Sequence, residues 1–192
     1  MDKTKNFCEL VRSRTQENKN GMFALHRGEE AISPMVSVLR QELDSMVRVI
    51  YLLSIQDLNL RETLISSTLE GKKWQIPTNN GKTKNITDKE MVELSQKLHG
   101  WSKSVYKFGC SFIHLSDFHN HTSQNPFESL PQEEQKNIIE HMRYYHGGPD
   151  SDCPTMKELS FYFPQVLEKI SSNLECYLKQ LEENEIPETE NV

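Results

Sequence analysis

The segment from Thr87 to His119 reads TDKEMVELSQKLHGWSKSVYKFGCSFIHLSDFH, and its apolar positions recur at alternating steps of three and four residues. That spacing places the side chains on one face of an α-helix. Thr87 and Glu90 form a capping box, which predicts where the helix begins. An unbroken helix to residue 120 would measure roughly 50 Å. Gly100 and Gly109 are therefore expected to mark a bend or a close helix contact.

The last position of this apolar series is a histidine. The series runs through Met91, Leu94, Leu98, Trp101, Val105, Phe108, Phe112, Leu115 and His119. An imidazole at a position where the pattern predicts an apolar side chain is a local inconsistency, and functional sites are often found at such positions. His119 and its neighbours are therefore the first candidates for a functional site.

Size and composition predict a single helical domain, residues 1–192. Of the 192 residues 35% are hydrophobic, enough for one sizeable core, which we place at residues 33–183. The tail, residues 184–192, is expected to be disordered.

A first helix is expected over residues 3–18, with Arg12 and Arg14 on a solvated face and Asn20-Gly21 after its end. Without repeats or strand alternation, the expected fold is an all-α antiparallel bundle of about five or six helices, with one irregular loop or small hairpin near 72–86.

Charge and cysteine usage narrow the class of protein. A net charge of −6 argues against non-specific coating of nucleic acid or anionic membranes, although a local basic patch is compatible with it. The most apolar segment, residues 46–55, is short and contains Arg48, so it is not expected to span a bilayer. Four cysteines without a C-x-x-C pair are typical of a reducing compartment. We therefore expect a cytoplasmic protein that is not attached to a membrane.

Two segments supply cations that are suited to an anionic ligand. In one helix, Arg40, Asp44 and Arg48 recur every fourth residue, either as an ordinary surface ion ladder or as a phosphate-binding face. Residues 72–86 contain no acidic residue and are turned by Asn80-Gly81. They form either an exposed solubilising loop or a nucleic-acid contact with an indole for stacking, through Lys72, Lys73, Trp74, Lys82 and Lys84.

A polar stripe accompanies the apolar series on the predicted helix. At about 100° per residue, Lys107, His114 and His121 fall on one line, with Asp117 close to it. A cation beside imidazoles suits phosphate stabilisation and proton transfer at a ribose hydroxyl, as metal-independent RNA cleavage requires. The alternative is a solvated stripe, with His119 a core histidine satisfied by a nearby hydroxyl or backbone carbonyl.

A metal site is the third interpretation of these residues. His114, Asp117 and His121 are ligand types that bind metals, but the outer two would lie about 10 Å apart on a straight helix. The Glu-x-x-His signature of di-iron bundles is also missing from the sequence. We therefore predict neither a metal nor a cofactor.

Two short strings carry a family resemblance. They are LRQELDSMVRVIYLL, residues Leu39–Leu53, and F-x-x-L-S-x-x-x-H, residues Phe112–His119. Together with the helix order over residues 33–183, they resemble the HEPN superfamily of small helical bundles, in particular its abortive-infection-related branch, in which a Tyr-x-x-Leu-Ser-x-x-x-His string ends a long helix. The resemblance implies an all-α fold, a two-fold homodimer through the helices that bear the motif, and often RNA cleavage in defence or toxin–antitoxin settings.

The sequence departs from the catalytic HEPN pattern, in which an arginine precedes a histidine by a few residues. Here Lys107 precedes His114, and lysine lacks the planar bidentate fork of arginine. Two functions are therefore predicted. The first is an RNA-directed effector, either an RNA-binding protein or a metal-independent ribonuclease with a histidine as general acid and base and with Lys107 or Arg48 steadying phosphate. The second is a noncatalytic dimeric module that binds a protein or a nucleotide.

Overall fold

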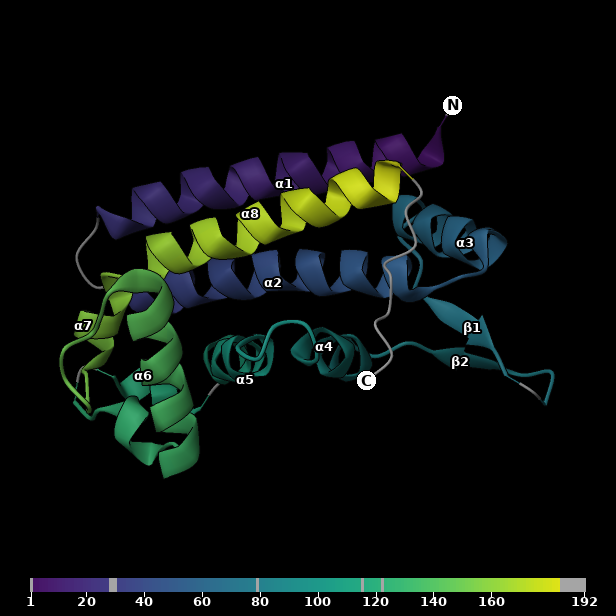
Figure 1. The fold of residues 1–192 in the computed structure, drawn as a ribbon. Helices are drawn as coiled ribbons and strands as arrows, with labels where there is room; N and C mark the ends of the chain where they lie inside the picture. The colour runs from purple at the N-terminus through teal and green to yellow at the C-terminus, as the bar shows by residue number, and fades with distance from the viewer. Residues whose placement is uncertain (1, 28–30, 79, 115, 122, 184–192) are drawn as a thin grey trace.

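The computed structural model describes residues 2–27, 31–78, 80–114, 116–121 and 123–183, which form an all-α bundle (Figure 1). The α-helices in this part of the chain are α1 (Lys3–His26), α2 (Ile32–Ser54), α3 (Leu58–Leu69), α4 (Asp88–Gln96), α5 (Ser102–Ile113), α6 (Gln132–His146), α7 (Met156–Ser160) and α8 (Phe163–Glu182). A hairpin of β1 (Gln75–Pro77) and β2 (Thr83–Asn85) and two 3-10 helices, η1 (Asp117–Asn120) and η2 (Pro126–Ser129), complete the fold. The predicted all-α class and the small hairpin near residues 72–86 are confirmed. The predicted tail, residues 184–192, lies outside the described residues.

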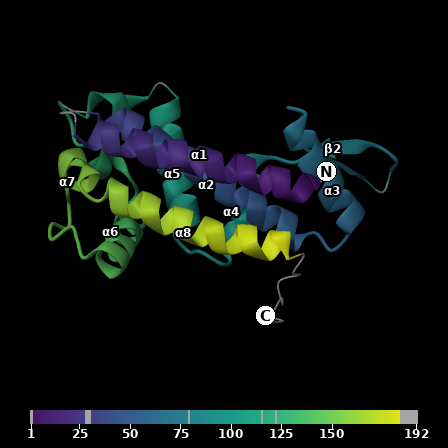
Figure 2. The same ribbon diagram turned by 90° about the horizontal axis from the view of Figure 1, so that it is seen from above.

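Helix α2 lies at the centre of the bundle. It contacts α1 and α8 on one side and α4 and α5 on the other (Figure 1), and α1 and α8 run side by side across it (Figure 2). Its fully buried apolar side chains point in several directions around the helix axis: Leu43, Met46, Val47, Val49 and Leu52. A helix that is apolar around most of its circumference is a core helix, so the other elements are arranged around α2.

Helix α1 is longer than the sequence predicted. Instead of ending before Asn20-Gly21, it continues to His26. Met22, in this added part, and Phe7, near the other end, are both buried. Burial of the Met22 side chain outweighs the roughly 1 kcal/mol that a glycine costs inside a helix. The core therefore includes α1 as well as residues 33–183.

The prediction of one continuous helix over residues 87–120 is wrong, because the chain forms α4, a bend at residues 97–101, and α5. The Gln96 side chain stabilises the bend by donating to the Gly100 carbonyl at 2.6 Å and accepting from the Lys103 backbone N–H at 2.9 Å. The two shorter helices lie side by side against α2 (Figure 1). A single straight helix of roughly 50 Å would instead extend past the bundle.

Local sequence signals mark the ends of several elements, and the predicted capping box of Thr87 and Glu90 is confirmed. Capping boxes begin α4 and α7, each with a threonine and a glutamate three residues later. The Asp57 side chain caps α3 by accepting from two backbone N–H groups, and Gly147 ends α6 with a φ of 75°. In the hairpin, Ile76 pairs with Lys84 in an antiparallel register. These ends depend on short-range hydrogen bonds and backbone preferences, which the sequence encodes directly.

Gly109 allows α5 to approach α2 closely. A Cβ atom at Gly109 would lie 2.8 Å from Cβ of Arg40 and 2.9 Å from its Cδ. The Cβ of Arg40 is fixed by the backbone of α2, so it cannot give way without moving the helix. Of the two glycines in the predicted helix, Gly100 therefore lies at the bend and Gly109 at the close helix contact.

We expect Gly109→Ala to lower the free energy of unfolding by about 1 to 2 kcal/mol, because overpacking strain exceeds the gain in helix propensity. Gly21→Ala is the matched control, since a Cβ at Gly21 of α1 meets no atom within 4 Å. It should raise the free energy of unfolding by about 0.5 to 1 kcal/mol. Urea denaturation measures both, and equal stabilisation by the two substitutions would contradict the close contact.

Candidate functional site

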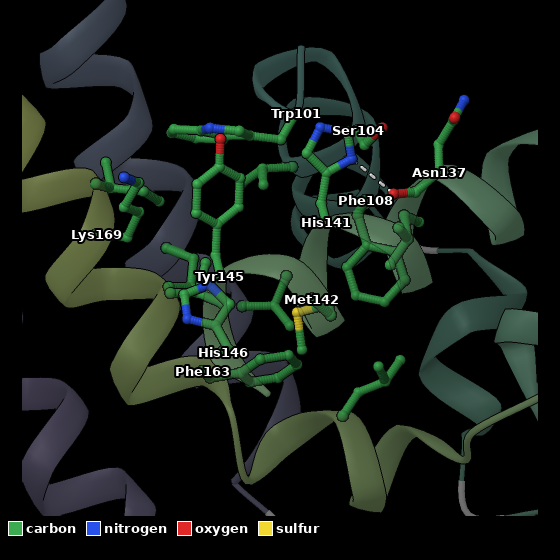
Figure 3. A pocket seen from close by; sticks show the side chains of 17 residues that line it. Trp101, Ser104, Phe108, Asn137, His141, Met142, Tyr145, His146, Phe163 and Lys169 are labelled. Atoms are coloured by element: carbon green, nitrogen blue, oxygen red, sulfur yellow. Dashed lines mark hydrogen bonds between the residues drawn. The ribbon is translucent and has the colours of Figure 1, made fainter. Parts of the chain in front are cut away.

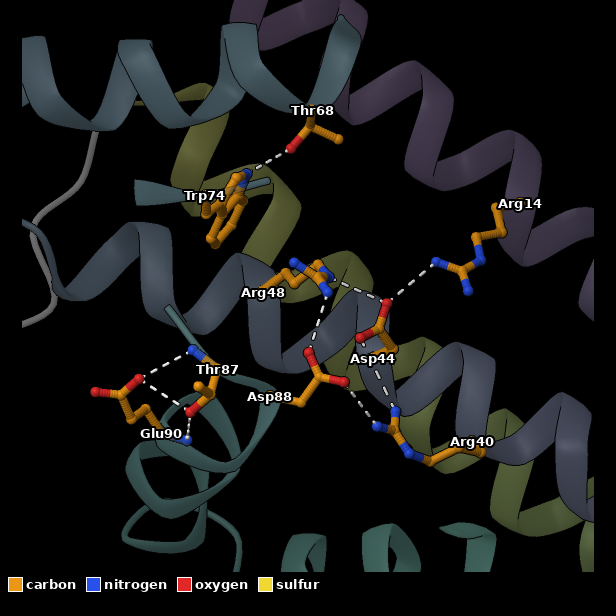
Figure 4. A network of polar contacts seen from close by, with 9 residues as sticks. All are labelled: Arg14, Arg40, Asp44, Arg48, Thr68, Trp74, Thr87, Asp88 and Glu90. Atoms are coloured by element: carbon orange, nitrogen blue, oxygen red, sulfur yellow. Dashed lines mark hydrogen bonds and ion pairs between the residues drawn. The ribbon is translucent and has the colours of Figure 1, made fainter. Parts of the chain in front are cut away.

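Three arginines converge on Asp44 where α1 and α2 lie together (Figure 4). Oδ2 of Asp44 accepts from Arg48 Nε at 3.1 Å and lies 3.4 Å from Nη1 of Arg14 on α1. Oδ1 of Asp44 lies 3.9 Å from Nη1 of Arg40. The ladder predicted along α2 therefore forms, and α1 adds a third guanidinium to it.

Asp88 joins this cluster from the first turn of α4. Its Oδ2 accepts from Arg40 Nη2 at 3.3 Å and its Oδ1 accepts from Arg48 Nη2 at 3.2 Å (Figure 4). A carboxylate at a helix N-terminus is also favoured by the helix dipole. Asp88 thus ties the start of α4 to two arginines that lie about two turns apart on α2.

Arg40 and Arg48 have different surroundings. The Arg40 side chain is 9% exposed, and its guanidinium carbon lies 4.2 Å from the centroid of the Tyr106 ring. Its Nε is buried without a hydrogen-bond partner among the described residues. The Arg48 side chain is 31% exposed and lies at the surface of the cluster. Of the two arginines that the sequence proposed for binding, Arg48 is accessible to a ligand and Arg40 holds helices together.

Arg48 opens onto a polar cleft of about 520 Å³ between α1, α2, the end of α3 and the start of α4. Four cationic side chains line it from three separate segments, against one carboxylate, Asp88. The cations are Arg14, Arg48, Lys72 and Lys73. Neutral hydrogen-bonding groups come from Thr68 and Asn85. Such a cleft is suited to an extended anionic ligand, because it offers several cations and further polar contacts along one surface.

Trp74 forms a wall of this cleft. The residue is 4% exposed, its Nε1 donates to Thr68 Oγ1 at 2.7 Å, and the guanidinium carbon of Arg48 lies 5.3 Å from its ring centroid. Its packing therefore positions Arg48. The remaining two lysines of the basic segment, Lys82 and Lys84, lie on the hairpin outside the cleft lining. Lys84 pairs with Glu90, which anchors β2 to α4.

The candidate catalytic residues lie elsewhere, in and after α5. Lys107 pairs with Glu134 of α6, with 3.1 Å between Nζ and Oε2. His114 is the exposed residue that follows α5, and His121, after η1, has its ring centroid 6.2 Å from that of Phe112. Nothing is described of the Asp117 side chain. Because α5 ends at Ile113, these residues do not form the stripe that a continuous helix predicted.

His119 does not occupy the core position that the apolar series assigned to it. It is exposed in η1, and its Nδ1 lies 3.3 Å from the carbonyl oxygen of Ser116. Phe118 is buried instead, with its ring 5.6 Å from that of Phe112 and 5.7 Å from that of Phe108. Once the helix ends, the chain turns the phenyl ring inward and the imidazole outward. A catalytic role for His114, His119 and Lys107 stays a prediction.

Comparison with protein-family models, with curated proteins and with solved structures found no match. The HEPN resemblance therefore stays a prediction. Within the described ranges, no group of three or more His, Cys, Asp and Glu side chains is arranged to hold a metal ion. None of the helices described is both long and apolar enough to cross a membrane.

Sequence reasoning found part of the cleft and missed the rest. Lys72, Lys73 and Arg48 were predicted for binding, and the fold brings them together. Arg14 was assigned to a solvated face, because its pairing with Asp44 depends on how α1 crosses α2. The sequence shows that Asp88 is an acidic residue at the start of a helix. No local signal shows that it pairs with arginines some 40 residues earlier in the chain.

We expect Asp44→Asn to lower the free energy of unfolding by about 2 kcal/mol, because three guanidiniums lose a largely buried carboxylate. Asp152→Asn is the matched control, because Asp152 also contacts an arginine but its side chain is 91% exposed. This control should cost less than about 1 kcal/mol. Urea denaturation measures both, and similar losses would contradict a structural role for the arginine cluster.

A second prediction concerns Glu90. Its hydrogen bond with Lys84, together with weaker contributions from hydrogen bonds with Thr87, lowers the pKa of Glu90 from 4.5 to about 2. A lowered folded-state pKa means that Glu90 stabilises the fold fully above about pH 4.5 and loses this effect as the pH falls through about 2. The difference in stability between wild type and Glu90→Gln should therefore be constant from pH 7 to about 5 and shrink below that. Urea denaturation at each pH tests this, and a pH-independent difference would contradict it.

Proposed function

We propose that the protein binds single-stranded RNA and that the RNA backbone lies in the cleft of Arg14, Arg48, Lys72 and Lys73. The convergence of these four cations from three segments on one polar cleft carries the proposal. Most protein contacts to nucleic acid go to phosphate and sugar, and lysine and arginine supply the main part of them. Because the whole chain carries a charge of −6, RNA would be attracted to this local surface and not to the protein at large.

Arg48 is the central contact of the proposed site. Its Nε and Nη2 donate to Asp44 and Asp88, which hold the guanidinium plane in one orientation. Nη1 has no hydrogen-bond partner in the described part of the chain and can donate to a phosphate oxygen. Lys72 and Lys73 are exposed beside it on a segment between α3 and β1. The arrangement therefore combines one oriented arginine with two adaptable lysines.

Our proposal is limited to RNA binding. RNA cleavage is a separate prediction that rests on the HEPN resemblance. A ribonuclease would use His114 or His119 as general acid and base, with Lys107 stabilising phosphate, at the junction of two chains in the predicted homodimer. Lys107 is engaged with Glu134 within one chain. The binding cleft needs no second chain, because all of its cations come from one.

Fluorescence anisotropy with a labelled single-stranded RNA of about 20 nucleotides tests the proposal, at salt concentrations between about 50 and 200 mM. We expect the Lys72→Ala/Lys73→Ala double variant to bind at least about fivefold more weakly at the lowest salt. Its slope of log affinity against log salt should be smaller by about 1.4, since two phosphate contacts are lost. The control is Lys103→Ala/Lys136→Ala, which removes the same charge from exposed lysines outside the cleft lining.

Absence of binding by the wild-type protein, or equal weakening by the two double variants, would contradict the proposed cleft. The same samples, run on a denaturing gel, show whether the RNA is cut. Cleavage that His114→Ala or His119→Ala abolishes, without a change in folding, would support the ribonuclease prediction. Intact RNA would support a binding protein without catalysis. Light scattering during gel filtration tests the predicted homodimer.

A further inference from the structure

A second cavity lies at the other end of the bundle, between α2, α5, α6, α7 and α8 (Figure 3). Its volume is about 90 Å³, and its mouth is open to solvent. Its walls are mainly apolar and aromatic, and include Leu39, Val105, Phe108, Met142, Leu159 and Phe163. Ligand sites for small molecules typically have apolar walls and a few polar groups that orient the ligand.

Lys169 of α8 is the cation of this cavity. It is half-buried, and its Nζ lies 4.6 Å from the centroid of the Tyr145 ring (Figure 3). The residues that line the cavity include no aspartate or glutamate, and Lys169 forms no ion pair with any described residue. The ammonium group of this half-buried side chain therefore has an aromatic face beside it and no anionic partner in the described part of the chain.

Two histidines of α6, His141 and His146, also line this cavity. Burial, followed by repulsion from Lys169, lowers the pKa of His146 below its usual value of 6.5. Nδ1 of His141 lies 2.7 Å from the backbone carbonyl oxygen of Asn137 (Figure 3). The cavity therefore presents one lysine, further hydrogen-bonding groups, and mainly apolar walls.

We propose that this cavity binds a small monocarboxylic acid with an apolar body, such as a medium-chain fatty acid. The carboxylate pairs with Lys169 at the mouth, and the apolar body lies between α5 and α6 against Phe108 and Met142. One ammonium group matches a single negative charge, whereas a phosphate dianion is usually held by several donors or by arginine. The apolar interior contributes the hydrophobic part of the affinity.

This proposal is independent of RNA binding, because none of the residues lining the cavity lines the cationic cleft. The two sites lie at opposite ends of α2, which contributes a polar side chain to one and apolar side chains to the other. Arg48 near the end of α2 lines the polar cleft, while Val36 and Leu39 near its beginning line the apolar cavity. Failure of one test therefore leaves the other unaffected.

Isothermal titration calorimetry with decanoate, decanol and decyltrimethylammonium, all below their micellar concentrations, tests the proposal. Decanoate should bind the wild-type protein most tightly of the three. Lys169→Met keeps the length and apolar character of the side chain without its charge, and should weaken decanoate at least about tenfold while leaving decanol unchanged. Lys179→Met is the matched control, an exposed lysine of the same helix outside the cavity lining, and should bind like wild type.

Ser104→Phe provides a second, independent variant, because Ser104 is a half-buried lining residue and a phenyl ring there would fill the cavity. It should abolish binding of decanoate and decanol together, with circular dichroism confirming that the variant is folded. Equal affinity for decanoate and decanol, tighter binding of the ammonium compound, an unchanged decanoate affinity in Lys169→Met, or no decanoate binding at all would each overturn the proposal.

Discussion

A helix that is apolar around most of its circumference needs packing partners on every side, and this requirement of α2 determines the architecture. Helices α1 and α8 cover one side and α4 and α5 the other, so that fully buried residues such as Leu43 and Leu52 are enclosed by four neighbours. The division of the predicted long helix into α4 and α5 follows from this requirement, because two short helices cover more of α2 than one straight helix that crosses it once.

The helices that cover α2 also surround its polar residues. Arg40, Asp44 and Arg48 occupy the strip of α2 that faces α1 and the start of α4, and there they form ion pairs with Arg14 and Asp88 instead of facing water alone. Pairing offsets the cost of removing charges from water, so this strip is matched by charged residues on the neighbouring helices. The cluster therefore fixes how three helices meet, and it leaves Arg48 at the edge of the cationic cleft.

The two ends of α2 have different chemistry. At its C-terminal end the basic segment after α3 contributes two lysines to a polar cleft, where we propose that RNA binds. At its N-terminal end α5, α6 and α8 meet around an apolar cavity with one ammonium group at its mouth. The ligands that we propose for the two sites would bind for different reasons, since binding at the charged cleft would rely on counterion release and binding in the open apolar cavity on burial of apolar surface.

The sequence alone determined the features that depend on near neighbours: the all-α class, the hairpin, the capping boxes of α4 and α7, and the glycine at the end of α6. It also identified Arg48, Lys72 and Lys73 as binding candidates. Only the tertiary structure decided that the predicted helix over residues 87–120 divides into two helices after Gln96, that Phe118 and not His119 enters the core, and that Arg14 and Asp88 join the arginines of α2. These outcomes depend on contacts between residues far apart in the chain, whose burial outweighs the small local preferences that a periodic pattern reports.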